Sequence, residues 1–171
     1  MNLNKIKMMV FDFDDTLLIH YKEKSLDSNG EDHRKRLISE QIENNQGYQI
    51  YDKIGVPNNL VQRFLEMYIE ITKNTNTPKY CISWVKDSLT LPFKKEWLEM
   101  HFPGQFNDVI GVSTPERKIT VAKILAEAYG IKPENVLVVD DYFVIVDEAH
   151  KAGFCAMSVQ ELMLRTMTMY E

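Results

Sequence analysis

Three acidic residues and a threonine directly follow an apolar run near the beginning of the chain. The run is MMVF over residues 8–11, and it continues into DFDDT over residues 12–16. Carboxylates this close repel one another, and the repulsion grows where burial removes water. A cation held between Asp12 and Asp14 would offset it. We therefore predict a buried strand whose carboxyl end delivers Asp12 and Asp14 into a metal-dependent active site.

Polar side chains follow three later apolar segments as well. They are Ser83 at the end of residues 79–83, Lys118 in the segment after residues 109–112, and Asp140 with Asp141 after residues 136–139. In an open sheet of parallel strands, the carboxyl ends of the strands lie along the same edge of the sheet, and binding sites form there. Two acid clusters behind two buried strands must be offset by positive charge, and Mg²⁺ with carboxylate ligands is the usual solution.

Strands and helices alternate along the chain, which predicts a parallel sheet covered by helices on both faces. Predicted strands span residues 6–13, 79–83, 109–112, 136–139 and 154–157. Predicted helices span residues 57–73, 92–101, 114–129, 146–152 and 160–169. We interpret residues 1–171 as one α/β domain with a Rossmann-like sheet of about five strands.

The helix that contains Lys118 has a clear predicted beginning and end. Thr114 is a candidate N-cap, Pro115 suits the first helical position, and Gly130 can end the helix. Lys118 then lies in the first turn, where the helix dipole disfavours a cation. On its own, this lysine is best explained as a solvated surface residue. Beside carboxylates and an expected phosphate, it becomes a candidate ligand.

Residues 19–56 differ in character from the rest of the chain and are predicted to form a small cap-like or lid insert. Basic and acidic residues are interleaved there, and we expect a short helix over residues 34–44. Candidates for contact with an anionic substrate are His20, Lys22, Lys24 and residues 33–36. An ordinary solvated surface explains the same pattern at least as well. The segment has too little apolar material to fold alone.

Composition and charge exclude some functions and favour others. The chain of 171 residues has a net charge of -5, which argues against a nucleic-acid binder. Cys81 and Cys155, its two cysteines, lie in apolar runs, so we expect buried reduced thiols and a cytoplasmic protein. No apolar stretch approaches membrane-spanning length, so we expect no membrane segment.

Together, these residues resemble the motifs of the haloacid dehalogenase-like (HAD) hydrolase superfamily. Its first motif, acid-x-acid-x-Thr after an apolar strand, matches residues 12–16. Its second, a hydroxyl residue ending a strand, matches Ser83, and its third, a lysine opening a helix, matches Lys118. Its fourth, an acidic pair, matches Asp140-Asp141. All four occur in order across nearly the whole chain except the insert, so the resemblance implies a HAD-like fold.

The resemblance also implies an activity, that of a Mg²⁺-dependent phosphatase acting on a small phosphorylated substrate. Asp12 would attack phosphorus to form an aspartyl-phosphate, and Asp14 would act first as general acid and then as general base. Asp14 favours phosphatases, since dehalogenases of the family lack an acid at that position. The remaining implied roles are Thr16, Ser83 and Lys118 as phosphoryl ligands, and the Asp12 side chain, the Asp14 backbone carbonyl, Asp141 and Asp140 as Mg²⁺ ligands.

Two features depart from the family pattern or compete with it. Many relatives carry another Asp or Asn four residues after the second acid of the fourth motif, where this chain has Ile145, with Asp147 two residues further on. This difference leaves the metal affinity open. Ser113 could compete with Ser83 as the second motif. We favour Ser83, because a helix and a strand separate it from Lys118, as the family pattern requires.

The sequence leaves three alternatives to hydrolysis. The same aspartyl-phosphate could pass its phosphoryl group to another acceptor, as in a phosphotransferase, or the scaffold could be a non-catalytic phosphate-binding regulator. A phospho-accepting receiver-type domain also combines acids, a hydroxyl and a lysine. Its acceptor aspartate follows a middle strand, however, and here that strand ends in Ser83. The physiological substrate and the oligomeric state are not readable from the sequence.

Overall fold

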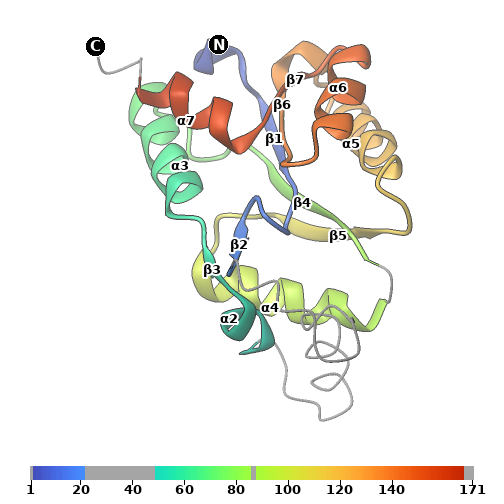
Figure 1. The fold of residues 1–171 in the computed structure, drawn as a ribbon. Coiled ribbons are helices and arrows are strands. Elements are labelled where there is room, and N and C mark those ends of the chain that lie inside the picture. Colours follow the sequence, from blue (N-terminus) through green and yellow to red (C-terminus); the bar gives the residue numbers. More distant parts are fainter. Residues whose placement is uncertain (1, 22–48, 86–87, 168–171) are drawn as a thin grey trace.

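A computed structural model describes residues 2–21, 49–85 and 88–167, and its centre is a five-stranded sheet (Figure 1). The strands are parallel, in the order β5-β4-β1-β6-β7. Their bounds are β1 Met8–Phe11, β4 Lys79–Trp84, β5 Asp108–Val112, β6 Val136–Val139 and β7 Cys155–Met157. The parallel sheet and the Rossmann-like α/β class predicted from the alternation are confirmed.

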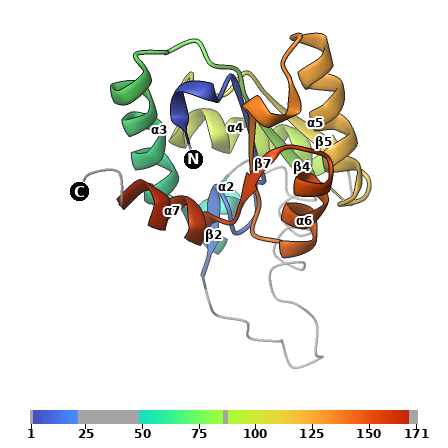
Figure 2. The same cartoon turned by 90° about the horizontal axis from the view of Figure 1, so that it is seen from above.

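Helices cover both faces of this sheet, as predicted. They are α3 (Asn59–Thr72), α4 (Leu91–His101), α5 (Arg117–Ala128), α6 (Phe143–Lys151) and α7 (Val159–Met167). Figures 1 and 2 show α3 and α7 on one side of the sheet and α5 and α6 on the other. Alternate residues of β1 enter the two cores: Met9 and Phe11 pack with α3, α4 and α7, whereas Met8 and Val10 pack with α5 and α6.

The strand register brings the carboxyl ends of β1 and its two neighbours together. Phe11, at the end of β1, pairs with Cys81 of β4 and with Val139 at the end of β6. Asp12 and Asp140 therefore follow neighbouring strand ends. The Asp12 N–H also donates to the Val139 carbonyl at 2.9 Å, which continues the pairing to the first acid of the site.

The helix that contains Lys118 begins later than predicted. α5 starts at Arg117, and the carbonyls of Thr114 and Pro115 accept hydrogen bonds from the N–H groups of Arg117 (3.2 Å) and Lys118 (3.0 Å). Thr114 is therefore not the N-cap, because a turn satisfies these N–H groups in place of its side chain. Lys118 remains in the first turn. Gly130, with a φ of 64°, follows the end of the helix as predicted.

The described residues of the 19–56 insert contribute to the core through helix α2 (Gln49–Ile54). They form the antiparallel pair β2 (Leu18–His20) and β3 (Gly55–Pro57), and α2 precedes β3. The α2 helix was not predicted; its Tyr51 packs edge-on against Phe13, with ring centroids 5.2 Å apart. The predicted helix over residues 34–44, Lys22, Lys24 and residues 33–36 lie outside the described residues.

Neither cysteine is in a disulfide. Cys81 is a buried free thiol in β4, whereas Cys155, at the start of β7, is a half-buried one. The prediction of buried reduced thiols is therefore correct for Cys81, and Cys155 is less covered than expected. Among the described residues, every helix is too short or too polar to span a bilayer.

Candidate active site

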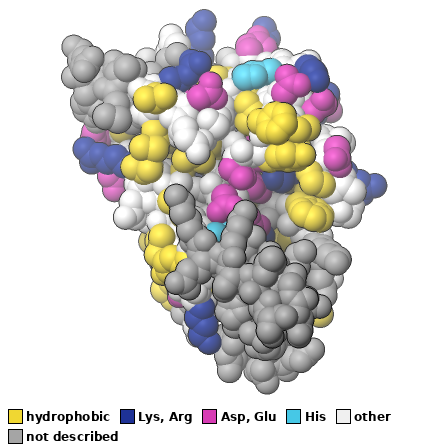
Figure 3. Space-filling model, viewed as in Figure 1, with side chains coloured by type: hydrophobic (Ala, Val, Ile, Leu, Met, Phe, Trp, Pro, Cys, Tyr) yellow, Lys and Arg dark blue, Asp and Glu magenta, His cyan; other side chains and the backbone are white. Residues whose placement is uncertain are grey.

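A buried lysine joins acids that follow different strands. The Lys118 Nζ lies 2.8 Å from Asp12 Oδ1, just after β1, and 2.8 Å from Asp140 Oδ2, just after β6. All three side chains are buried. Three residues that are far apart in the sequence, each predicted to belong to the site, are thus in direct contact. On the face shown in Figure 3, acidic side chains gather near the centre of the molecule.

Burial and crowding make Asp12 an unusual carboxyl group. Loss of water raises its pKa to about 8; Lys118 opposes this shift, whereas Asp140 and Asp14 add to it. Burial alone would lower the pKa of Lys118, but Asp12 and Asp140 raise it above its ordinary value. One lysine does not balance the acids around it. A further cation would stabilise the ionised form of Asp12.

Carboxylate oxygens of Asp12, Asp140 and Asp141 lie within 4.8 Å of one another, close enough to hold one metal ion. The two acids after β6 are not equivalent. Asp140 Oδ2 accepts from Lys118, and Asp140 Oδ1 accepts from the Tyr142 N–H at 3.0 Å. Asp141 is more exposed, and partial loss of water and the neighbouring Asp140 raise its pKa. Hard oxygen donors of this kind fit Mg²⁺, and Asp141 is the freer ligand.

Asp14 has different partners, among them a second buried lysine. The Lys94 Nζ donates to Asp14 Oδ2 at 2.6 Å and to Ser83 Oγ at 2.8 Å, and His20 Nε2 lies 3.0 Å from Asp14 Oδ1. Burial alone would raise the pKa of Asp14, but the charge and hydrogen bond of Lys94, together with His20, hold it well below its ordinary value. Asp14 is therefore held as a carboxylate.

Lys94 is absent from the predicted site, although the sequence contains a sign of it. It precedes the buried Trp97 and Leu98 by three and four residues in α4, so it shares their face of the helix. A lysine on a core-facing stripe must find buried acceptors. His20, a candidate for contact with an anionic substrate, contacts Asp14 through its Nε2. Its Nδ1 is buried and has no hydrogen-bond partner among the described residues.

The two hydroxyls predicted to bind the phosphoryl group are both buried. Ser83 Oγ accepts from Lys94 and makes a long contact of 3.4 Å to the carbonyl of Trp84. Thr16 Oγ1 has no hydrogen-bond partner within the described part of the chain, and a buried hydroxyl without a partner suits a ligand from outside the protein. The Thr16 carbonyl accepts from Asn58 Nδ2 at 2.8 Å, which ties this loop to the N-cap of α3.

Asp15 lies between Asp14 and Thr16 in the sequence, but its carboxylate accepts a hydrogen bond from a backbone N–H group. Its φ of 55° is in the left-handed region, which aspartate and asparagine tolerate better than most residues. Its Oδ1 accepts from the His20 N–H at 3.2 Å. Asp15 therefore stabilises the turn after β1.

No family model and no curated protein matches the sequence, whereas solved structures match the fold. A HAD-family enzyme from Bacteroides thetaiotaomicron, in complex with magnesium and inorganic phosphate, is 12% identical with a TM-score of 0.56, over 90% of this chain and 93% of that one. An L-2-haloacid dehalogenase is 14% identical with a TM-score of 0.57, over 95% and 99%. A phospho-aspartyl intermediate analogue of phosphoserine phosphatase is 13% identical with a TM-score of 0.55, over 96% and 98%. This chain has the HAD fold.

Within this HAD fold, the residues that depart from or compete with the family motifs lie away from the acids. Ile145 is buried in the core that α5 and α6 form with the sheet. Asp147 is exposed and pairs with Lys151 at 2.7 Å, so neither residue joins the group of Asp12, Asp140 and Asp141. Ser113 lies in the loop after the edge strand β5, whereas Ser83 is on β4 beside β1. Of the two serines, Ser83 is the one linked to the acids that follow β1, because Lys94 contacts both Ser83 and Asp14.

Proposed function

We propose that this chain is a Mg²⁺-dependent phosphatase, a phosphoric monoester hydrolase that works through an aspartyl-phosphate on Asp12. The observation that carries the proposal is the buried contact of Asp12 with Lys118 beside the oxygens of Asp140 and Asp141. It joins a nucleophile, a cation for the phosphoryl group and a metal-binding acid cluster at the carboxyl ends of the strands. Structures with the same fold that contain magnesium, phosphate or a phospho-aspartyl analogue support it.

The proposed reaction has two steps. In the first, a carboxylate oxygen of Asp12 bonds to phosphorus while the bond from phosphorus to the ester oxygen breaks, and Asp14 gives that oxygen a proton. In the second, water attacks phosphorus, Asp14 takes a proton from it, and the Asp12 carboxylate leaves with release of inorganic phosphate. Lys94 and His20 favour the ionised form of Asp14, which the second step needs. For the first step, Asp14 must bind a proton.

The other predicted residues stabilise negative charge in this reaction. Lys118, already within 2.8 Å of Asp12, would also neutralise the phosphoryl oxygens. The hydroxyls of Ser83 and Thr16 would donate to the same oxygens. Mg²⁺, held by the carboxylates that follow β1 and β6 and by the Asp14 backbone carbonyl, would supply the positive charge that this acid cluster lacks.

Asp14 favours phosphate esters over halogenated acids as substrates, although a haloacid dehalogenase shares the fold. An ester oxygen leaves as a strong base and needs a proton, whereas a halide is a weak base and needs none. An acid at this position supports phosphate esters, because Asp14 can carry that proton once it has bound one, and Lys94 and His20 hold its two oxygens in place. We propose a small phosphorylated substrate, with water as the acceptor of the phosphoryl group.

Turnover of an aryl phosphate tests the proposal. We expect the purified protein with Mg²⁺ to release the phenol and inorganic phosphate, and Asp12→Asn to abolish release, because an amide is a much weaker nucleophile. Asp15→Asn is the matched control: it makes the same change nearby, and asparagine tolerates the left-handed backbone. It should keep full activity. Equal activity of the two variants would rule out the proposed mechanism.

Other outcomes separate the alternatives. Halide release from a haloacid, without phosphate release, would favour a dehalogenase. Transfer of the phosphoryl group to an added alcohol, faster than to water, would favour a phosphotransferase. A lasting phosphoryl-aspartate without turnover would favour a receiver-type domain. Mg²⁺ binding with neither a phosphoryl-aspartate nor turnover would favour a non-catalytic regulator.

A further inference from the structure

We propose that Lys94 is a positioning residue of this active site, which fixes the carboxylate of Asp14 and sets the Ser83 hydroxyl as a hydrogen-bond donor to the phosphoryl group. The inference rests on the phosphatase function proposed above. The Lys94 Nζ lies 2.6 Å from Asp14 Oδ2 and 2.8 Å from Ser83 Oγ. One nitrogen therefore joins the loop after β1, the end of β4 and helix α4.

The direction of the bond to Ser83 follows from the chemistry of lysine. An ammonium group has three N–H donors and no acceptor, so the Ser83 oxygen must accept from Lys94. The single O–H of Ser83 must then donate elsewhere, and its present partner is the Trp84 carbonyl at a long 3.4 Å. A phosphoryl oxygen is a charged acceptor and a better partner. Lys94 thus orients Ser83 as a donor before the substrate arrives.

Lys94 also decides how Asp14 is held. Its bond to Oδ2 and the His20 contact to Oδ1 engage both carboxylate oxygens. The side chain of Asp14 is 42% exposed, so without these partners it would be free to rotate. Proton exchange with an ester oxygen or a water needs the carboxylate within hydrogen-bond distance of it. Lys94 therefore fixes the proton carrier as well as the phosphoryl ligand.

Burial of Lys94 removes water from its ammonium group, and this loss of hydration free energy must be offset by the contacts that the group makes. Its side chain is 5% exposed, and its ammonium lies 4.5 Å from the centroid of the Phe13 ring. An apolar side chain of similar length could fill this position without loss of hydration. The partners of the ammonium, Asp14 and Ser83, are the features of the site that require a cation here.

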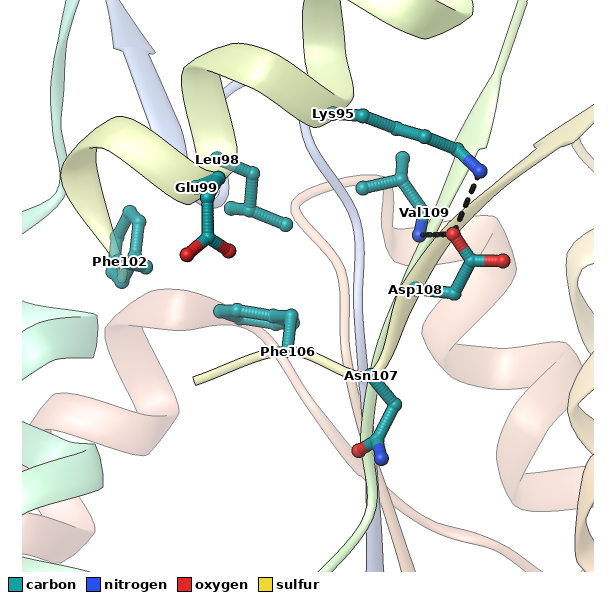
Figure 4. Close-up of a pocket in the computed structure, with 8 residues that line it drawn as sticks. All are labelled: Lys95, Leu98, Glu99, Phe102, Phe106, Asn107, Asp108 and Val109. Atoms are coloured by element: carbon teal, nitrogen blue, oxygen red, sulfur yellow. Dashed lines mark hydrogen bonds and ion pairs between the residues drawn. The ribbon is translucent and has the colours of Figure 1, made fainter. Parts of the chain in front are cut away.

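The next residue of α4 provides a contrast. Lys95 pairs with Asp108 Oδ1 at 2.7 Å, beside a pocket that Phe102 and Phe106 also line (Figure 4). Asp108 is the first residue of β5, whereas the acids of the site follow the carboxyl ends of strands. Both members of the Lys95–Asp108 pair are about half exposed, so the pair contributes little to stability. Lys95→Met therefore removes the same charge outside the site.

A double-mutant cycle tests the coupling between Lys94 and Ser83. The values of kcat and KM for an aryl phosphate with Mg²⁺ are measured for the wild type, Lys94→Met, Ser83→Ala and the double variant. We expect Ser83→Ala to lower kcat/KM about 10- to 100-fold in the wild type. In the Lys94→Met background, Ser83→Ala should lower kcat/KM less than about threefold, because an unoriented hydroxyl contributes little. Lys95→Met should behave as the wild type.

Two results would overturn the inference: the same loss from Ser83→Ala in both backgrounds, or wild-type kinetics in Lys94→Met. Thermal unfolding shows whether each variant is folded. If Lys94→Met is not, Lys94→Gln takes its place in the cycle, because glutamine is polar but too short to bridge both partners. The same loss from Ser83→Ala in that background would again overturn the inference.

Binding of inorganic phosphate keeps this test separate from turnover. Its dissociation constant with Mg²⁺ is measured by calorimetry for the same four proteins. We expect Ser83→Ala to weaken phosphate binding at least about tenfold only when Lys94 is present. This coupling without any turnover in the wild type would contradict the proposed function and support the role of Lys94. Turnover without the coupling would overturn the role of Lys94 alone.

Discussion

Two buried lysines reach the candidate active site from opposite faces of the sheet, and each bridges two of its side chains. Lys118 comes from α5 and contacts two buried acids, Asp12 and Asp140. Lys94 comes from α4 and contacts one acid, Asp14, together with the Ser83 hydroxyl. We refer to these groups as the Lys118 side and the Lys94 side of the site.

The difference between the two sides gives neighbouring carboxyl groups opposite character. On the Lys118 side, burial dominates and one cation serves two acids, so the pKa of Asp12 is raised to about 8. On the Lys94 side, burial would raise the pKa of Asp14, but Lys94 and His20 serve this one acid and lower its pKa. In the proposed mechanism, Asp12 needs a further cation to act as an anionic nucleophile, whereas Asp14 is already ionised and can act as a base. The proposal therefore assigns metal binding to the Lys118 side and proton transfer to the Lys94 side.

Among the changes that test this comparison, the largest effect is expected from Lys118→Met. It should lower kcat/KM for an aryl phosphate at least about 10³-fold, because loss of one stabilising donor typically costs about 10²–10³ and this change also removes the ammonium that Asp12 and Asp140 share. Lys94→Met, which leaves Asp12 untouched, should cost less. Steady-state kinetics at saturating Mg²⁺ measure both. A greater loss in Lys94→Met than in Lys118→Met would reverse the comparison.

The Lys118 side could be predicted from the sequence because its geometry follows from regular structure. Parallel strands bring their carboxyl ends together, so acids after residues 8–11 and 136–139 had to meet. Lys118 opens α5, the helix that connects the edge strand β5 to β6, which limits where its side chain can reach. Error in the exact helix start, at Thr114, did not move Lys118 out of the first turn.

On the Lys94 side, Asp14 and Ser83 were predicted, but the lysine that bridges them was not, because its contacts depend on how separate elements pack. The partners of Lys94 are set by the rotation of α4 against the sheet, which no local pattern specifies. The α2 helix is only six residues long and is held by tertiary contacts, such as the 2.8 Å bond from Trp97 Nε1 to Asp52. The greater availability of Asp141 as a candidate metal ligand could not be predicted either, because it depends on the hydrogen bonds that both oxygens of Asp140 accept.

A smaller effect should distinguish the two acids that follow β6. Asp141→Asn should raise the Mg²⁺ concentration for half-maximal activity at least about tenfold and recover most of kcat at high Mg²⁺, because asparagine keeps an oxygen but loses the charge. Asp140→Asn should lower kcat even at saturating Mg²⁺, because Asp140 also holds Lys118. Titration of activity with Mg²⁺ measures both quantities. Identical titrations for the two variants would contradict this division of roles.

The smallest effect is expected in the stability of the metal-free protein. The raised pKa of Asp12 means that the folded protein holds a proton between about pH 5 and pH 8 that the unfolded chain, with a carboxyl pKa near 3.9, has lost. Rising pH therefore favours unfolding. Relative to Asp12→Asn, the free energy of unfolding of the wild type should fall by about 1.4 kcal/mol per pH unit in this window.

Denaturant unfolding in a chelator, at several pH values, measures this slope. Asp14→Asn is the matched control, because the lowered pKa of Asp14 keeps it ionised throughout the window. This variant should keep the slope, and loss of the Asp14 charge, which helps to raise the pKa of Asp12, should only lower the pH at which the slope ends. Saturating Mg²⁺ should abolish the slope, because the ion binds ionised Asp12 and replaces its proton. Parallel curves for the wild type and Asp12→Asn would mean that Lys118 alone balances the charge of Asp12. The two sides would then differ only in which side chains their lysines contact, and not in the protonation of Asp12 and Asp14.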